Sequence, residues 1–184
     1  MSGSLTNYRP TRAEALCAFI AVEKYLWHTA SVFCYSAGSF RYAIDQERIG
    51  DVDIIVSYLP EQKASLDHAL ASIFGRHDNG SPKTQGLIGQ IQVDLFPIQK
   101  EYVGAVETFY GNPLPLQMAL RAIAAARGFK LTPQGLKDRN TAELIPTHTV
   151  KDVFDLLGVE QFTPIQTANA AHYKMENTEV FSNV

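Results

Sequence analysis

Apolar residues recur along the chain with two periods, that of a helix and that of a strand. The first helix is predicted over residues 11 to about 28, where Thr11 and Glu14 have the spacing of a capping box, in which each side chain accepts a hydrogen bond from the other residue's backbone N–H. Helical spacing of apolar residues predicts further helices over residues 60–74, 115–127 and 149–157. A glycine that can end a helix follows each of them, at Gly75, Gly128 and Gly158.

Other segments have the character of strands. Residues 31–39, SVFCYSAGS, form a continuous apolar run that ends in small residues, which favours a buried strand followed by a tight turn. In DVDIIVSY, residues 51–58, the alternation places Asp51 and Asp53 on one face and the apolar residues on the other. The same alternation in GLIGQIQVDLFPI, residues 86–98, places Asp94 on a polar face.

The order of these elements predicts the fold class. A helix, strands, a helix and further strands precede a more helical and basic C-terminal part, which is typical of an α+β fold with one mixed sheet. Residues 77–82, HDNGSP, are expected to form a loop. Residues 167–184 have no sustained period, and we expect them to be a flexible tail.

Composition excludes several classes of protein. The chain has 184 residues, 46% of them hydrophobic, enough to bury a core as a main body with a small subdomain. Cys17 and Cys34 lie in apolar patterns and are too few for a disulfide framework or a zinc cluster, which favours a reducing cytoplasm. No apolar run approaches the roughly 20 residues that span a bilayer, and the start of the chain lacks the apolar core of a signal peptide. We expect a cytoplasmic protein without a membrane partner.

Charge is distributed unevenly. The formal net charge is −3, but residues 121–139 contain five basic residues and one acidic residue, a local charge of +4 that leaves −7 for the remainder. A basic face for nucleic acid is therefore compatible with an acidic total.

The aspartates suggest a chemistry. Asp51 and Asp53 are two residues apart, so on a strand their side chains share a face about 7 Å apart along the chain. Carboxylates held this close repel one another unless a cation lies between them. If the strand of Asp94 lies beside theirs, three carboxylates surround one pocket, a ligand set that suits Mg²⁺. Gly38 and Ser39 can offer a backbone N–H and a hydroxyl to an anion.

Each of these features also has a simpler interpretation. An Asp-x-Asp at the start of a strand is commonly a solvated end, Gly-Ser is a common turn, and Asp94 alone could be an exposed strand residue. The combination of all three favours metal-assisted nucleotidyl transfer. The five histidines are too scattered to indicate a metal site of their own.

Several motifs resemble one family. The segments GSFR, GDVDII and VDLF, the long run FYGNPLPLQMALRAIAAARGFKLTPQGL, and TVKDVFDLLGVEQFTPIQ resemble the palm and thumb of the family X DNA polymerases, the polymerase beta group. The likeness covers roughly residues 11–166, and the chain is similar to the short viral members that keep only these two parts. It implies an α+β nucleotidyltransferase palm over residues 1–110, a small α/β thumb over 111–166 and a tail over 167–184.

The resemblance assigns roles to the palm residues. Asp51 and Asp53 would bind two Mg²⁺ ions, with Mn²⁺ as an alternative, and Asp94 would bind the catalytic ion near the primer 3′-hydroxyl. The incoming triphosphate would contact Gly38, Ser39 and Arg41. The chain also departs from the family: Tyr42 stands where a second arginine is common, which suggests Arg48 as a substitute phosphate ligand, and Gln92 replaces an arginine two residues before the third aspartate.

The resemblance also assigns roles at the end of the palm and in the thumb. Phe109, Tyr110 and Gly111 fall where the family places its steric gate against the ribose 2′-hydroxyl, although Asn112-Pro113 alters the turn after the gate. The DNA contacts would come from Gln117, Arg121, Arg127 and Lys130, the first two in the minor groove.

The function implied is template-directed addition of deoxynucleotides to a primer, across short gaps in DNA repair and without a lyase domain. The partners would be primer–template or gapped DNA and deoxynucleoside triphosphates, and we expect a monomer. Two alternatives stay open: a small nucleotidyltransferase that modifies RNA, a protein or a small molecule, and an inactive relic that binds nucleotide or DNA without turnover.

Overall fold

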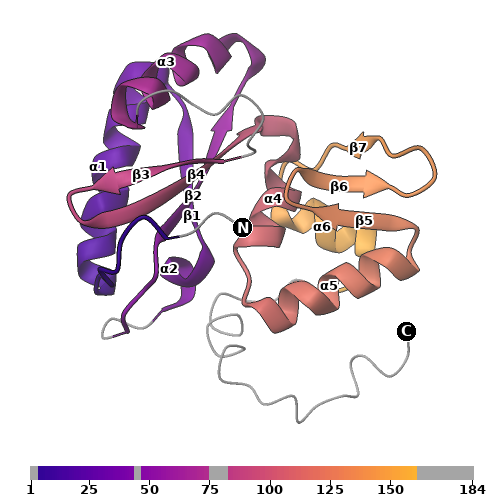
Figure 1. The fold of residues 1–184 in the computed structure, drawn as a ribbon. Coiled ribbons are helices and arrows are strands. Elements are labelled where there is room, and N and C mark those ends of the chain that lie inside the picture. The colour runs from indigo at the N-terminus through magenta and orange to yellow at the C-terminus, as the bar shows by residue number, and fades with distance from the viewer. Residues whose placement is uncertain (1–3, 44–46, 75–82, 161–184) are drawn as a thin grey trace. The chain divides into compact units, whose positions relative to one another are not determined.

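The protein consists of two units, Met1–Lys100 and Glu101–Val184. A computed structural model describes residues 4–43, 47–74 and 83–160, and each unit is considered by itself (Figure 1). The expected stop at Gly75, the loop at 77–82 and the tail at 167–184 lie outside the described residues.

The first unit is built on a four-stranded mixed sheet. Its strands are β1 (Phe33–Ala37), β2 (Val52–Tyr58), β3 (Thr84–Ile88) and β4 (Ile91–Gln99), in the order β1-β2-β4-β3. The central pair, β2 and β4, is parallel, whereas β1 and β3 run antiparallel to their neighbours. This sheet, together with the helices, confirms the predicted α+β class.

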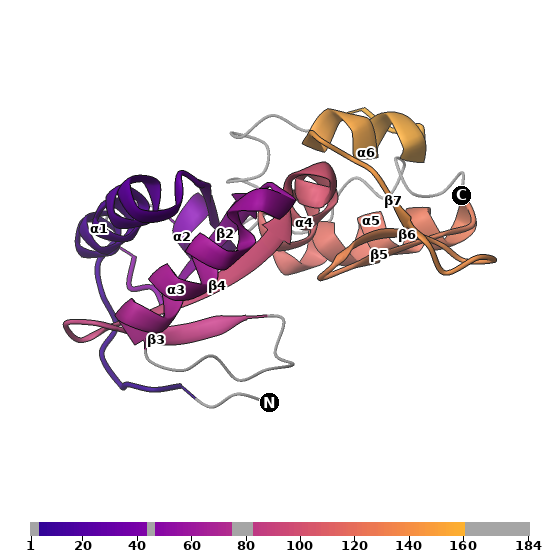
Figure 2. The same ribbon diagram turned by 90° about the horizontal axis from the view of Figure 1, so that it is seen from above.

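Two long helices cover one face of this sheet. They are α1 (Arg12–Ala30) and α3 (Lys63–Phe74), the latter preceded by the 3₁₀ turn η1 (Pro60–Gln62), and they lie side by side (Figure 2). Thr11 caps α1, and its capping box with Glu14 is present as predicted. Leu26 of α1 and Leu66 of α3 pack with Ile54 of β2 in one buried cluster, so the apolar face of β2 points to the helices.

Two local features of the first unit differ from the sequence prediction. Residues 86–98 do not form one strand: β3 and β4 make a hairpin that turns at Gly89, whose φ of +62° favours glycine. The Gly-Ser turn after β1 is instead the start of a short helix, α2 (Gly38–Tyr42).

The second unit combines three helices with a second sheet. The 3₁₀ turn η2 (Lys100–Tyr102) leads into α4 (Val103–Tyr110), which is followed by α5 (Leu114–Ala126), β5 (Phe129–Thr132), β6 (Gly135–Asp138), β7 (Leu144–Ile145) and α6 (Val150–Leu157). The three strands are antiparallel, in the order β5-β6-β7. The helices predicted over 115–127 and 149–157 are confirmed within one residue, whereas the prediction of a single sheet is wrong.

The helix α4 was not predicted, and its first turn explains why. The N–H of Gly104 donates to the carbonyl of Thr147 at 2.7 Å, and the N–H of Ala105 donates to the Thr147 hydroxyl at 3.1 Å. The first turn of this helix is therefore satisfied by a residue more than 40 positions away, which no local pattern reveals. Because α4 packs on α6 and β6, it belongs to the second unit, which begins at Glu101. The boundary between palm and thumb at residues 110 and 111 stays a prediction.

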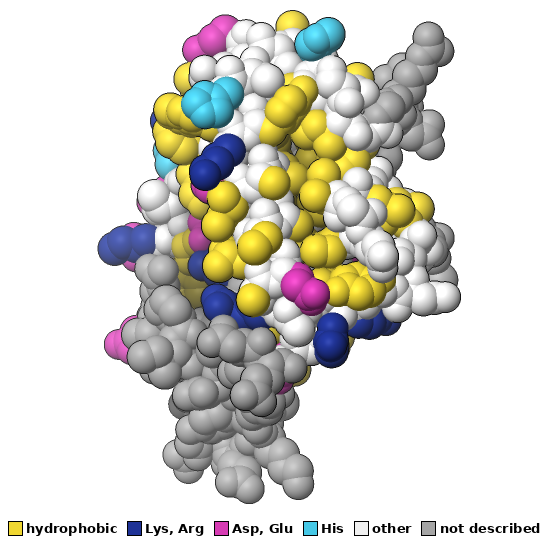
Figure 3. Space-filling view, turned by 90° about the vertical axis from the view of Figure 1, so that its left-hand side faces the viewer, with side chains coloured by type: hydrophobic (Ala, Val, Ile, Leu, Met, Phe, Trp, Pro, Cys, Tyr) yellow, Lys and Arg dark blue, Asp and Glu magenta, His cyan; other side chains and the backbone are white. Residues whose placement is uncertain are grey.

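The outer side of α1 is also apolar. Leu16, Ile20 and Trp27 are between 36% and 47% exposed, and the Trp27 ring lies 5.2 Å from that of Phe33. Figure 3 shows hydrophobic side chains gathered on this side of the first unit. Among the described residues, no helix is both long enough and apolar enough to cross a membrane.

Candidate metal centre

The parallel pair β2 and β4 brings the predicted carboxylates together. Asp53 and Asp94 are register partners on these neighbouring strands, and Asp51 lies just before β2. Ligand oxygens of the three residues all lie within 4.8 Å of one another. The arrangement expected from the spacing of the aspartates is therefore present.

Gly38 allows the chain to pass directly over this cluster. Its φ is +58°, and a Cβ built at this position would lie 1.8 Å from Oδ2 of Asp53. No side chain fits there, because an atom pair at that distance overlaps. The glycine of the Gly-Ser pair is thus required by the carboxylate that it faces.

Burial and mutual repulsion make it unfavourable for all three carboxylates to be ionised together. Burial, followed by the neighbouring charges of Asp51 and Asp94, raises the pKa of Asp53 to about 7. Burial and the charge of Asp94 also raise the pKa of Asp51, while Lys83 and Arg9 act in the opposite direction. A divalent cation would relieve this repulsion, and three converging carboxylates fit the oxygen ligands that Mg²⁺ prefers.

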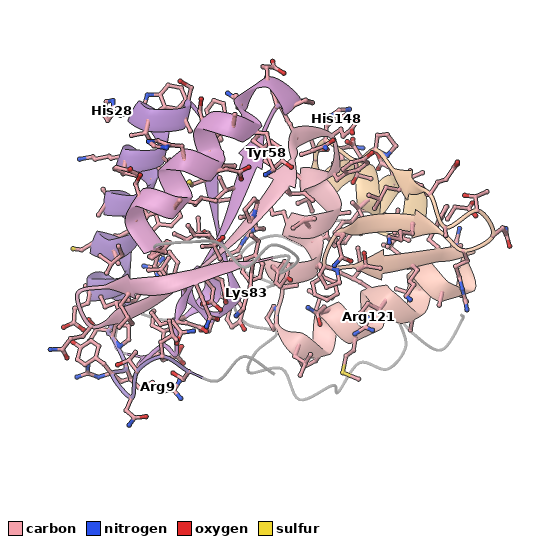
Figure 4. The ribbon with its side chains drawn as sticks, turned by 45° about the horizontal axis from the view of Figure 1, so that its top comes forward. Arg9, His28, Tyr58, Lys83, Arg121 and His148 are labelled. Atoms are coloured by element: carbon pink, nitrogen blue, oxygen red, sulfur yellow. The ribbon has the colours of Figure 1, made fainter. Side chains whose placement is uncertain are left out.

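Two basic residues that the sequence patterns did not single out lie by the cluster. The ammonium of Lys83 forms an ion pair with Oδ2 of Asp94; the Lys83 side chain is 22% exposed and that of Asp94 is 3% exposed. The Arg9 guanidinium lies against Gly50, where a Cβ would be 2.6 Å from its Nη1. These two residues belong to segments before β3 and before α1, respectively (Figure 4). Both lie in irregular segments just before a helix or a strand, and in such segments hydrophobic periodicity does not indicate where a side chain points.

Gln92 makes a second buried contact with Asp94. Its side chain lies in β4, where the residue is 4% exposed, and its Nε2 donates to Oδ1 of Asp94 at 3.0 Å. Its Oε1 accepts a hydrogen bond from the backbone N–H of Leu5 at 2.8 Å. Sequence analysis noted this residue only as a departure from the family pattern.

The residues expected to contact triphosphate have different surroundings. Ser39 and Arg41 lie in α2, directly after Gly38. Arg48 donates to the Arg9 carbonyl at 2.9 Å, and its guanidinium is 3.9 Å from the carboxylate of Glu14. The role of Arg48 as a phosphate ligand stays a prediction, and it would have to compete with these contacts.

In the second unit, the predicted gate and minor-groove residues contact one another. The rings of Phe109 and Tyr110 meet edge to face at 5.0 Å, directly before Gly111. The side chain of Gln117 donates to the Phe109 carbonyl at 2.6 Å, and the Arg121 guanidinium lies 5.9 Å from the centre of the Phe109 ring. The end of α4 is thereby fixed to one side of α5.

The basic segment of the second unit surrounds an open cavity. Met118, Phe129 and other residues of α5 and β5 line a volume of about 450 Å³, which Arg121, Lys130 and Arg139 also border. Arg127 is exposed elsewhere: its guanidinium lies beside Gly158, at the C-terminal end of α6, where a Cβ would be 2.9 Å from its Nη1. Of the predicted DNA contacts, Arg121 and Lys130 therefore share a surface, and Arg127 contacts a helix end.

Comparisons with known proteins agree with the family resemblance. Residues 115–166 match the thumb of DNA polymerase beta. The fold is similar to that of Leishmania infantum polymerase beta in a crystal structure of a ternary P/T complex, with a TM-score of 0.68 over 88% of this chain and 77% of that chain. The two sequences are 15% identical, so this likeness shows the fold. No curated protein matches the sequence.

Proposed function

Because the chain is a family X polymerase-like protein in its fold and in its thumb segment, we propose that it is a template-directed DNA polymerase. It adds deoxynucleotides to a primer 3′-hydroxyl by two-metal nucleotidyl transfer and fills short gaps during DNA repair. The observation that carries this proposal is the convergence of Asp51, Asp53 and Asp94 within 4.8 Å in a fold of the polymerase beta type.

The carboxylates would hold the ions on which the reaction depends. Asp51 and Asp53 would bind both Mg²⁺ ions, and Asp94 would bind one of them. When bound, the ions supply the positive charge that offsets the triphosphate and lowers the proton affinity of the attacking hydroxyl. In the proposed reaction, the 3′-oxygen would form a bond to the α-phosphorus, the bond from that phosphorus to pyrophosphate would break, and the hydroxyl proton would pass to the Asp94 carboxylate.

Residues near the carboxylates would bind the nucleotide. Gly38 holds the backbone close to Asp53, so that the first residues of α2 can reach a phosphate held by the same ions. Ser39 would offer its hydroxyl and Arg41 its guanidinium, which matches phosphate geometry. In the second unit, Phe109 and Tyr110 would exclude a 2′-hydroxyl by contact, and deoxynucleotides would be preferred.

The basic surface of the second unit would bind DNA. Arg121, Lys130 and Arg139 border an open cavity whose lining is otherwise largely apolar, a combination suited to phosphates with attached sugars and bases. Arg121 also contacts Phe109, so a minor-groove contact by this residue would be linked to the sugar gate.

Primer extension tests the proposal directly. Wild-type protein is incubated with gapped, recessed or single-stranded DNA, deoxynucleotides, and Mg²⁺ or Mn²⁺, and products are separated on a gel. We expect extension by single nucleotides that depends on the template and on metal, most efficient on a short gap. Asp94→Ala should give no product, whereas Asp67→Ala, which removes an exposed carboxylate paired with Lys63, should behave as wild type.

The alternatives give different results. Transfer of a nucleotide to RNA, protein or a small molecule with no DNA product would replace the polymerase assignment with that of another nucleotidyltransferase. Nucleotide and DNA binding without product under both metals and with all acceptors would identify a relic.

A further inference from the structure

Asp94 is held at both of its carboxylate oxygens. Oδ1 accepts a hydrogen bond from Nε2 of Gln92 at 3.0 Å, and Oδ2 pairs with the ammonium of Lys83. These donors differ in charge. An ammonium competes with any cation that approaches Asp94, whereas a neutral amide leaves the full charge of the carboxylate available to a metal ion and can keep its bond while the ion is bound.

The amide of Gln92 is itself oriented by the start of the chain. Its Oε1 accepts a hydrogen bond from the Leu5 N–H at 2.8 Å. A flipped amide would place Oε1 against the Asp94 carboxylate and Nε2 against the Leu5 N–H, so both contacts would become repulsive. The two contacts therefore fix the direction of the donor.

The N-terminal segment has further anchors on the way to α1. The N–H of Ile49 donates to the carbonyl of Pro10 at 2.9 Å, and Thr11 forms an isolated β-bridge with Arg48. Residues 4–11 are thus attached both to β4 and to the chain that immediately precedes Asp51.

We propose that Gln92 is a positioning residue for Asp94, and that the backbone at Leu5 keeps Gln92 in the orientation that this requires. The inference rests on the proposed function, because it assigns Gln92 a purpose in metal binding and nucleotide addition. The link holds Oδ1 of Asp94 in one direction, so that the carboxylate meets the incoming ion and the primer hydroxyl without first rotating.

The test removes the Leu5 N–H while leaving every side chain of the cluster in place. Leu5→Pro has no backbone donor, and Leu5→Ala is the matched control that keeps it; the Leu5 side chain is 46% exposed, so its loss changes little. Gln92→Leu removes both halves of the link with a side chain of similar size. Each variant is examined as the full chain.

Two measurements separate positioning from folding. In ¹⁵N-labelled protein without metal, the Gln92 side-chain amide signal reports the link directly, and Gln92→Leu identifies that signal by its disappearance. Mn²⁺ affinity, measured by electron paramagnetic resonance, reports the site. We expect Leu5→Pro to shift the Gln92 signal and to weaken Mn²⁺ binding by about 10-fold, within the usual range for residues that orient a metal ligand. The melting temperature should match that of Leu5→Ala.

Kinetics complete the test. For both Leu5→Pro and Gln92→Leu, kcat should fall by about 10- to 100-fold with little change in the KM for nucleotide, because the bond acts on Asp94 rather than on the triphosphate. An unchanged Gln92 signal and unchanged Mn²⁺ affinity in Leu5→Pro would overturn the inference. Failure of the wild type to bind Mn²⁺ would instead overturn the proposed function, and the amide signal would still show whether the link exists.

Discussion

In the first unit, three carboxylates lie within 4.8 Å of one another and Asp94 is 2% exposed, whereas in the second unit Arg121, Lys130 and Arg139 are exposed around an open cavity. Like charges that are buried together destabilise one another and gain most from a bound ion. Like charges spread over a wet surface repel only weakly, because water and salt screen them. In the proposed function, the first unit concentrates charge for chemistry and the second distributes charge for binding.

The largest effect should come from removing one buried carboxylate. Asp94→Ala is expected to abolish nucleotide addition, with a loss of at least about 10³-fold, because in the proposed function this residue binds a metal ion beside the reacting hydroxyl. Nucleotide binding through Asp51 and Asp53 should largely survive. Single-turnover primer extension beside a nucleotide-binding titration measures both quantities, and full activity in this variant would contradict the catalytic assignment of Asp94.

The next largest effect should come from a side chain added at Gly38, where the backbone passes close to the Asp53 carboxylate. Gly38→Ala should lower both stability and activity, since its Cβ would overlap Oδ2 of Asp53 and its φ of +58° is unfavourable for alanine. Gly89→Ala separates these causes, because its φ is +62° and no described atom lies within 4 Å of the added Cβ. Gly89→Ala should cost about 1 kcal/mol in unfolding free energy and leave activity intact. Similar losses of stability and activity in both variants would show that the contact with Asp53 does not matter.

Stability of the metal-free protein should depend on pH through Asp53. Its pKa is raised from 3.8 to about 7, so between these values the folded protein binds a proton that the unfolded chain does not, and stability falls as pH rises through this window. Asp53→Asn removes the penalty. It should raise the melting temperature on the order of 5 °C at pH 8 and by less than half as much at pH 5, because only part of the window between the two pKa values lies below pH 5.

Thermal unfolding in the presence of a chelator provides this measurement. Asp67→Asn serves as the control, because this carboxylate is exposed and pairs with Lys63 on α3. Added Mg²⁺ should narrow the difference between wild type and Asp53→Asn at pH 8. Equal melting temperatures of wild type and Asp53→Asn at both pH values without metal would show that ionisation of Asp53 does not destabilise the fold.

The smallest effect should come from the exposed cations. Lys130→Ala is expected to weaken binding to all DNA sequences by a similar factor and to reduce the slope of log K against log salt by about 1. Fluorescence anisotropy over a range of NaCl concentrations measures the slope. Lys151→Ala removes an exposed lysine that is paired with Asp155 outside the cavity, and its slope should match that of wild type.

The parts of the structure that were predictable depend on neighbours in sequence. The capping box at Thr11, the helix ends at Gly128 and Gly158, and the alternation of β2 follow from periods and caps that a few consecutive residues define. The convergence of Asp53 and Asp94 was conditional on a strand pairing, which the structure provides.

The parts that were missed depend on distant partners. The acceptor for N–H groups in the first turn of α4 is Thr147, and the bond that orients Gln92 comes from the backbone at Leu5, 87 residues away. Nearly every residue has the same backbone N–H and C=O groups, so the sequence does not indicate which of them will form a hydrogen bond with a buried side chain. Lys83 was overlooked because it follows a polar segment in which a lysine is unremarkable.

The ion pair between Lys83 and Asp94 has a practical consequence for handling the protein. A tethered ammonium already offsets part of the charge of the cluster, so the fold has a counter-ion of its own when metal is withdrawn. Purification in a chelator should therefore yield intact protein that regains full activity when Mg²⁺ is restored. The same tether would set a threshold in the proposed function, because an entering ion would have to displace Lys83 from Asp94, and metal too dilute to do so would leave the protein inactive.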